Sequence, residues 1–128
     1  METAQNKIVK AALLGAGTVG SGVYQLVQER QEDFSHICGT QIQITKILVR
    51  DASKEREGIP SPLLTDNWNE IIEDDSISII IEVMGGIEPA KSYLLEAMKA
   101  GKQIVTANKD LIAEHGHELL DSAEKYGW

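Results

Sequence analysis

The sequence contains few of the features that mark secreted, membrane-spanning or nucleic-acid-binding proteins. It has one cysteine, three prolines and one phenylalanine in 128 residues. The single cysteine, Cys38, cannot form an internal disulfide, and no stretch approaches the roughly 18 to 20 apolar residues that a membrane-spanning helix requires. Basic residues number 12 against 20 acidic ones, and the net charge of -8 argues against a surface for the nucleic-acid backbone. We therefore expect no membrane and no nucleic acid among its partners.

The remaining composition is that of an ordinary globular domain. Hydrophobic residues make up 42% of the chain and charged residues 25%. The length suits one domain, because single domains cluster at roughly 100 to 150 residues. We expect residues 1–128 to form one domain, and without a secretory signal pattern we expect a cytoplasmic protein.

Short apolar runs alternate with helical patterns along the chain. The predicted strands cover residues 9–14, 42–49, 77–83 and 103–106, and the predicted helices cover residues 18–32, 68–72, 89–98 and 111–126. Thr65 or Asp66 is expected to cap the second helix. In the first helix, the expected buried face consists of Val19, Val23, Leu26 and Val27. Alternation at this spacing predicts an α/β fold with a doubly wound parallel sheet and helices on both faces.

The first predicted strand ends in a glycine-rich turn that leads directly into the first helix. The turn reads Gly15-Ala16-Gly17-Thr18-Val19-Gly20, which fits G-x-G-x-x-G in the context that makes this motif informative. Gly15 permits a tight turn, Gly17 lets the backbone approach a pyrophosphate, and Gly20 lets helix and strand pack closely. The alternative is that these glycines only close a strand-helix turn. We favour a Rossmann-like dinucleotide site, with the helix amides facing the anion.

The end of the second strand bears on the choice of cofactor. It reads Val49-Arg50-Asp51, with Lys54 close behind. An arginine here accommodates the 2′-phosphate of NADP, whereas a carboxylate bonds the ribose 2′-hydroxyl of NAD. Asp51 is adjacent and could oppose a phosphate, and Arg50 and Lys54 could be solvated loop charges. We expect NADP to be preferred over NAD.

Two glycines lie at the carboxyl end of the third predicted strand, the edge of an open α/β sheet where ligands bind. Met84, Gly85 and Gly86 follow Val83, and the glycines would let the backbone approach the ribose or nicotinamide. Glu82 lies inside an otherwise apolar strand. It is either paired in the core or faces the site.

The fourth predicted strand ends in Thr106-Ala107-Asn108-Lys109. This segment supplies a hydroxyl, an amide and an ammonium at the same sheet edge, and we take Thr106 and Lys109 as candidate cofactor-binding residues. Lys109 could contact the nicotinamide side of the cofactor or the substrate. The alternative is that Asn108 caps the last helix and Lys109 points to solvent.

The histidines do not have the spacing of a metal site. His115 and His117 are two residues apart and diverge on a helix, while His36 and Cys38 lie far away in the sequence. We expect no metal site.

Four segments, in this order, are similar to the amino-terminal cofactor domain of homoserine dehydrogenase. They are residues 15–20 (GAGTVG), 48–51 (LVRD), 81–90 (IEVMGGIEPA) and 101–109 (GKQIVTANK). The resemblance implies reversible, NADPH- or NADH-dependent reduction of L-aspartate 4-semialdehyde to L-homoserine, in the biosynthesis of threonine, methionine and isoleucine.

The resemblance also implies roles for individual residues. Ala16, Thr18 and Val19 would contact the pyrophosphate and Arg50 the 2′-phosphate. The inner half of the cofactor would lie against Met84 and Gly85. Lys109 matches a lysine near the nicotinamide and substrate, which makes it a candidate catalytic residue.

Members of this family continue into a substrate and dimerisation region that holds the main catalytic residues. The resemblance therefore implies that this chain ends before them and binds cofactor without turnover, while the full-length protein acts on a small-molecule substrate as a homo-oligomer. Two alternatives stay open. One is a free-standing NAD(P)-sensing regulatory module, and the other is the cofactor domain of another amino-acid or aldehyde dehydrogenase.

Overall fold

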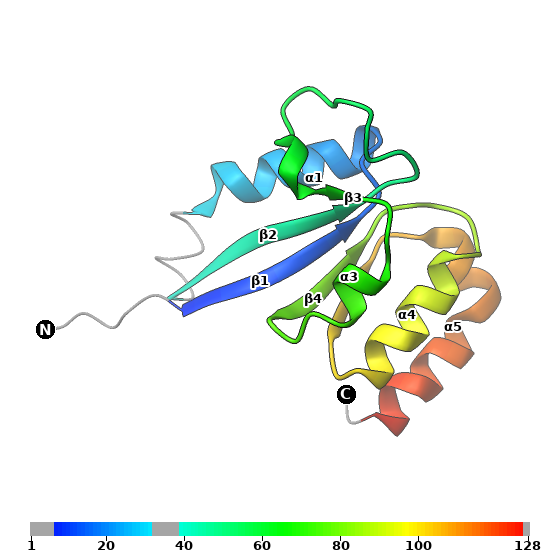
Figure 1. Cartoon of the computed structure of the whole chain (residues 1–128). Coiled ribbons are helices and arrows are strands. Elements are labelled where there is room, and N and C mark those ends of the chain that lie inside the picture. The colour runs from blue at the N-terminus through cyan, green and yellow to red at the C-terminus, as the bar shows by residue number, and fades with distance from the viewer. Residues whose placement is uncertain (1–6, 32–38, 127–128) are drawn as a thin grey trace, which may run out of the picture.

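A computed structural model describes residues 7–31 and 39–126. In this part of the chain, five parallel strands form one sheet in the order β3-β2-β1-β4-β5 (Figure 1). The strands are β1 (Lys7–Leu14), β2 (Thr40–Leu48), β3 (Leu64–Thr65), β4 (Ile77–Glu82) and β5 (Gln103–Thr106). The helices are α1 (Thr18–Glu29), the 3-10 turn η1 (Ser61–Leu63), α3 (Asn69–Ile72), α4 (Ala90–Lys99) and α5 (Lys109–Lys125). His36, Cys38 and Trp128 lie outside the described residues.

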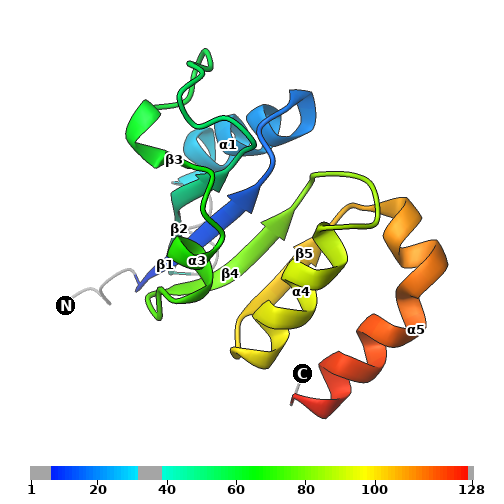
Figure 2. The same ribbon diagram turned by 45° about the vertical axis from the view of Figure 1, so that its right-hand side comes forward.

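The helices lie on both faces of the sheet. Helix α1 covers one face, α3 and α4 cover the other, and α5 packs against α4 (Figures 1 and 2). The strand order reverses direction at β1, because β2 and β3 lie on one side of it and β4 and β5 on the other. The predicted doubly wound, Rossmann-like fold is confirmed. No helix among the described residues is long and apolar enough to cross a membrane.

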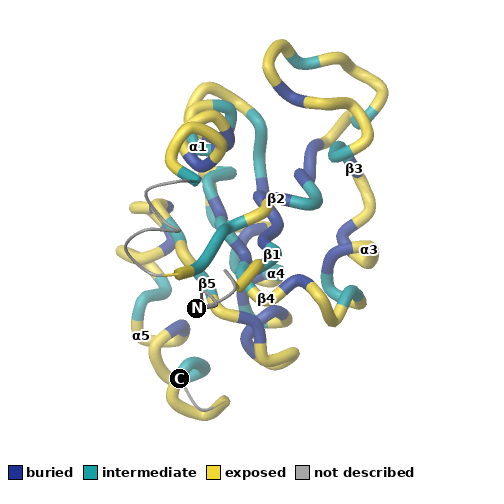
Figure 3. The backbone as a smooth tube through the Cα atoms, turned by 90° about the vertical axis from the view of Figure 1, so that its left-hand side faces the viewer, coloured by how far each residue is buried: buried dark blue, intermediate teal, exposed yellow. Residues whose placement is uncertain are grey.

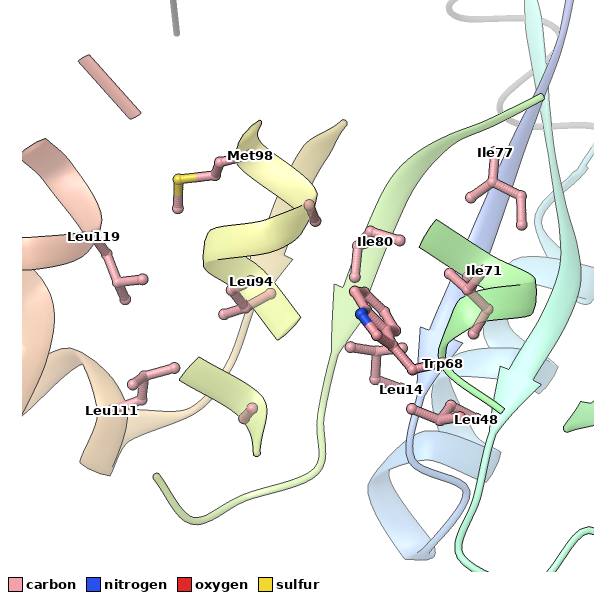
Figure 4. Packing of buried hydrophobic residues seen from close by; sticks show 13 residues of the cluster. Leu14, Leu48, Trp68, Ile71, Ile77, Ile80, Leu94, Met98, Leu111 and Leu119 are labelled. Atoms are coloured by element: carbon pink, nitrogen blue, oxygen red, sulfur yellow. The ribbon is translucent and has the colours of Figure 1, made fainter. Parts of the chain in front are cut away.

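The core is divided into two layers by the central strand β1. Its last four residues, Ala11 to Leu14, have no exposed surface, as expected for a parallel strand covered on both faces (Figure 3). Leu13 packs into the layer beneath α1, whereas Ala12 and Leu14 pack into the layer beneath α3 and α4. Figure 4 shows Trp68 of this second layer beside Ile80 and Leu14. The alternation of side chains thus joins both helical layers to one strand.

The sequence predicted neither a helix nor a strand between residue 49 and the second helix, and residues 49–63 form a loop that ends in η1. Gly58, Pro60 and Pro62 explain the absence of a helix, because glycine and proline disfavour helix interiors. The sequence analysis missed β3, whose two residues are too few to show a periodicity.

Two details of the helices also differ from the prediction. The first residue flanking α3 is Trp68, and the Asn67 side chain accepts from the Asn69 amide, so the expected cap at Thr65 or Asp66 is wrong. On α1 the buried residues are Gly20, Tyr24 and Val27. Val19 and Leu26 are 59% and 52% exposed, so the predicted inward face is wrong at both positions. The small Gly20 places the helix close to the strand and shifts the buried face toward its own side.

Candidate functional site

The glycine-rich turn is shaped by contacts that exclude side chains at two of its positions. Gly15 has a φ of 108°, and a Cβ there would lie 3.3 Å from the Met84 Cα. A Cβ at Gly20 would lie 2.8 Å from the carbonyl carbon of Gly15 and closer still to its oxygen. The predicted roles of Gly15 in the turn and Gly20 in helix-strand packing agree with this geometry.

Gly17 differs from both of these residues because a side chain there would have open space around it. A Cβ at Gly17 would meet no atom within 4 Å, and the residue is exposed. Gly17 is also the residue before α1, and no side chain caps the first amides of that helix. An open backbone beside uncapped helix amides fits a ligand with an anionic group.

A pocket of about 480 Å³ opens at the carboxyl edge of the sheet, beside this turn. Six of the predicted site residues line it: Gly15, Ala16, Gly17, Arg50, Met84 and Gly85. The other lining residues are Leu48, Val49, Lys54, Arg56, Asp66, Glu88, Pro89 and Tyr93. The glycine turn, the end of β2 and the loop after β4 therefore meet at one cavity, as the parallel topology predicts.

Three cations gather at the β2 side of the pocket. Arg50 and Lys54 both line it and are exposed, and Arg56 lies beside them. The Nη1 of Arg56 donates to the carbonyls of Asp51 at 3.2 Å and Lys54 at 3.0 Å, so this side chain also braces the loop. The sequence analysis missed Arg56, because an isolated arginine in a charged loop gives no signal of its position.

The Asp51 carboxylate, which the sequence left as a possible opponent of a phosphate beside Arg50, is hydrogen-bonded to Ser53. Its Oδ1 accepts from the Ser53 hydroxyl at 2.6 Å and from the Ser53 amide at 3.0 Å. These hydrogen bonds, together with the nearby Arg56 and Lys54, hold the pKa of Asp51 below its usual value. Asp51 does not line the pocket, whereas Arg50 does. The local geometry therefore favours anion binding at the end of β2.

Two other carboxylates line the pocket, and neither was predicted. The Oε1 of Glu88 accepts from the Ser92 hydroxyl at 2.8 Å and from the Ser92 amide at 3.1 Å, which lowers its pKa. Glu88 thus accepts hydrogen bonds from the first turn of α4. Asp66 follows β3 directly and is exposed. Its position could not be predicted, because β3 itself was missed.

Glu82, whose role the sequence left undecided, is fully buried and hydrogen-bonded. Its Oε2 accepts from the Met84 amide at 2.9 Å and from Asn108 Nδ2 at 3.3 Å. Its Oε1 accepts from the Thr106 hydroxyl. Glu82 is therefore paired in the core, immediately beneath the loop that lines the pocket.

The remaining predicted site residues do not line the pocket. Thr18 and Val19 form the exposed start of α1, and the Thr106 hydroxyl is engaged by Glu82. Asn108 caps α5 by accepting from the Leu111 amide at 3.1 Å, as the alternative interpretation expected. Lys109 is the exposed first residue of α5. Thr106 and Lys109 thus lie at the end of β5 and the start of α5, outside the lining of the pocket.

Histidines and carboxylates do not gather into a candidate metal site in residues 7–31 and 39–126, since no group of three or more ligating side chains occurs there. His115 instead lies 3.5 Å from Glu118 within α5, and Lys91 of α4 lies 2.8 Å from the same carboxylate. The contact between Lys91 and Glu118 joins α4 to α5.

Comparisons with known proteins place this geometry in a family. The family model for the NAD-binding domain of homoserine dehydrogenase matches residues 15–128. Homoserine dehydrogenase of Bacillus subtilis is 43% identical over 122 residues, which cover 94% of this chain and 28% of that protein. The chain therefore spans little more than a quarter of the length of this relative.

Solved structures agree with the sequence comparison. A crystal structure of S. aureus homoserine dehydrogenase is 49% identical, with a TM-score of 0.87 over 94% of this chain and 32% of that one. A hyperthermophilic archaeal homoserine dehydrogenase in complex with NADPH has a TM-score of 0.71 at 23% identity, over 94% of this chain and 42% of that chain, a likeness of fold. The chain belongs to the family of homoserine dehydrogenase NAD-binding domains.

Proposed function

We propose that this chain binds NADP(H) in the pocket at the carboxyl edge of the sheet, as the cofactor domain of an enzyme that interconverts L-homoserine and L-aspartate 4-semialdehyde. The observation that carries the proposal is the continuity of the pocket. It runs from the glycine turn, where Gly17 leaves open space, to the cations Arg50, Lys54 and Arg56. A dinucleotide has its pyrophosphate and its 2′-phosphate at two such separated positions.

The pyrophosphate is assigned to the turn of residues 15–20. The amides of Thr18 and Val19 at the uncapped start of α1 would donate to its oxygens, and Ala16 and Gly17 would form the floor beneath it. Gly15 and Gly20 act indirectly, since they let the turn approach β4 and α1 pack against the turn.

The 2′-phosphate is assigned to the three cations. Arg50 would bind it bidentately, Lys54 would add a second charge, and Arg56 would hold the loop while presenting its free guanidinium nitrogens. The Asp51 carboxylate is hydrogen-bonded to Ser53, so it would not compete with the phosphate for these cations. The archaeal relative whose structure was solved with NADPH supports NADPH as the cofactor.

The inner half of the cofactor is assigned to Met84 and Gly85 in the loop after β4, with Thr106 and Lys109 at the neighbouring strand end. A bound nicotinamide supplies or accepts the hydride of the reaction. Lys109 would contribute a positive charge where cofactor and substrate meet. The substrate-binding residues and the subunit contact of a homo-oligomer are assigned to the rest of the longer protein, which we place in the cytoplasm.

The proposal is tested by calorimetric titration of this chain with NADPH and with NADH. We expect NADPH to bind more tightly. Arg50→Ala should weaken NADPH binding by about tenfold to a hundredfold and leave NADH binding nearly unchanged, because a charge-assisted bidentate contact to phosphate contributes on this scale. Arg56→Ala should weaken both nucleotides, since Arg56 also braces the loop.

Lys99→Ala is the matched control for the loss of one positive charge. Lys99 lies in the last turn of α4, is exposed, and does not line the pocket. A similar loss of NADPH affinity in Lys99→Ala and Arg50→Ala would mean that net charge alone governs binding. Absence of binding by either nucleotide up to millimolar concentration would contradict a cofactor site in this chain.

A further inference from the structure

Glu82 lies at the centre of a buried polar cluster. The proposed cofactor contacts do not explain why a glutamate is buried there. It is the last residue of β4 and has no exposed surface. Its carboxylate accepts three hydrogen bonds, from the Met84 amide, the Asn108 amide group and the Thr106 hydroxyl. Within residues 7–31 and 39–126 no ion pair involves it. A buried carboxylate without hydrogen-bond donors is costly in free energy. The carboxylate therefore holds its three donors in place.

Asn108 extends the cluster to the glycine loop and to α5. Its Nδ2 donates to the Gly86 carbonyl at 2.6 Å as well as to Glu82, and its Oδ1 accepts from the Leu111 amide at 3.1 Å. Its own amide donates to the Thr106 hydroxyl oxygen at 3.1 Å. One side chain thus joins the loop after β4, the end of β5 and the first turn of α5.

The two glycines of the loop after β4 have no side chains to pack, whereas Met84 before them packs against the core. Gly85 and Gly86 have φ values of 78° and 74°, and both are exposed. A Cβ at either position would meet nothing within 4 Å. The loop is instead held at both ends, by Glu82 at the Met84 amide and by Asn108 at the Gly86 carbonyl. Glycines without packing contacts adopt many conformations unless such contacts select one.

We propose that Glu82 is a positioning residue that holds the Met84–Gly86 loop and the Asn108–Lys109 segment in one fixed arrangement, so that the inner half of the cofactor and the Lys109 ammonium meet. The proposal rests on the proposed cofactor site. Lys109 directly follows Asn108 and begins α5, so the direction of its side chain is set by the same cluster.

The first test measures amide hydrogen exchange in the ligand-free chain. Glu82→Gln preserves the shape of the side chain and removes one of its acceptors. We expect exchange at the Met84 and Leu111 amides to rise together, by about tenfold, with the buried Ile44 amide unchanged. Leu111 is the informative amide, because its partner is Asn108 and not Glu82.

Glu70→Gln is the matched control for the exchange experiment. Glu70 also accepts from a buried threonine hydroxyl at a strand end, that of Thr65, but its side chain is 48% exposed and it does not line the pocket. This variant should leave Met84 and Leu111 unchanged. A rise at Met84 without a rise at Leu111, or a uniform rise across the chain, would overturn the proposed coupling.

The second test is a double-mutant cycle on NADPH affinity with Glu82→Gln and Lys109→Ala. No hydrogen bond or ion pair joins the Glu82 and Lys109 side chains, so a purely structural role of Glu82 predicts independent effects. We expect Lys109→Ala to weaken binding at least about fivefold more in the wild-type background than in the Glu82→Gln background. Equal effects in both backgrounds, including no effect in either, overturn the positioning role.

The two tests separate failure of this inference from failure of the cofactor site. If the wild-type chain binds no NADPH, the proposed function fails, and the exchange experiment alone decides whether Glu82 couples the two segments. If the wild-type chain binds NADPH and the cycle is additive, only the positioning role of Glu82 fails.

Discussion

The turns that follow β3 and β5 have the same local chemistry in different surroundings. Each reads Thr-x-Asn, and in each the threonine hydroxyl accepts from the asparagine amide at 3.1 Å and donates to a glutamate. In each the asparagine side chain then accepts from an amide at the start of a helix. The three residues of the turn therefore fix its local geometry at both places.

The glutamate partners separate the two turns. After β3 the partner is Glu70, only five residues along the chain, half-exposed and also 3.4 Å from the Lys46 ammonium. After β5 the partner is Glu82, which lies in the neighbouring strand and has no exposed surface. Water can reach the Glu70 carboxylate, whereas the Glu82 carboxylate has no surface open to water. The comparison teaches that the same motif is local and replaceable at β3 but joins separate segments at β5.

Removal of the two glutamates should give the largest difference. Glu82→Leu removes a fully buried acceptor of three hydrogen bonds, and we expect the free energy of unfolding to fall by about 3 kcal/mol or more. Glu70→Leu should cost less than about 1 kcal/mol, because the Glu70 side chain is half-exposed and its ion pair with Lys46 is also open to solvent. Urea denaturation of both variants measures the difference. Equal losses would show that burial does not distinguish the two turns.

Removal of the two threonine hydroxyls should give the next largest difference. Thr106→Val deletes a donor to Glu82 and an acceptor for the buried Asn108 amide, for an expected loss of about 2 kcal/mol. Thr65→Val should lose about 1 kcal/mol, since Asn67 and Glu70 are exposed and can bind water. Thermal unfolding gives the ranking. A Thr65→Val variant less stable than Thr106→Val would contradict this ranking.

Removal of the two asparagine side chains should give a smaller difference. Asn108→Ala removes the cap of α5 and the contact to the Gly86 carbonyl, and we expect a loss of about 1.5 kcal/mol. Asn67→Ala removes one contact to the four-residue helix α3 and should cost about 0.5 kcal/mol. Circular dichroism should show less helix at equilibrium only for Asn108→Ala under mild urea, because α5 has 17 residues.

The sequence predicted the parts of this comparison that depend on nearby residues. Asn108 was weighed as a helix cap from its place before a helical pattern, and the strand that precedes it, 103–106, was predicted with its observed bounds. The glycine turn was predicted from Gly15, Gly17 and Gly20, and at Gly15 and Gly20 the backbone does approach too closely for a Cβ. Spacing along the chain contains this information.

The sequence could not predict the parts that depend on residues brought together by the fold. Glu82 bonds partners 24 and 26 residues away, so its strand alone left two roles open. Arg56 reaches the pocket through a loop whose path follows no periodicity. On α1, hydrophobic spacing placed Val19 inward, whereas the close approach permitted by Gly20 determined which face is buried. Such contacts are set by packing in three dimensions.

A third turn at the same sheet edge is more exposed than the other two. Its removal should have the smallest effect on stability. In Asp51-Ala52-Ser53 the serine hydroxyl and amide both donate to Asp51, and they lower its pKa from the usual 3.8. A lowered folded-state pKa contributes stability that is present above the unfolded-state value and is lost as the pH falls through the folded-state value. The stability from this turn is therefore complete above about pH 4 and disappears only at lower pH.

Ser53→Ala should raise the pKa of Asp51 toward 3.8, because the serine hydroxyl is the largest cause of its lowering. The stability difference between wild type and variant should be constant from pH 7 to about pH 5. It should shrink below about pH 4, because Asp51 then becomes protonated in the folded and the unfolded states of both proteins. NMR titration of the Asp51 carboxyl and urea unfolding at each pH measure the two quantities. Ser76→Ala is the control, because Ser76 makes the same two contacts to Asp74 at the opposite end of the sheet and should leave Asp51 unchanged. An unaltered Asp51 pKa in Ser53→Ala would mean that the exposed turn, unlike the buried one after β5, owes nothing to its side-chain hydrogen bond.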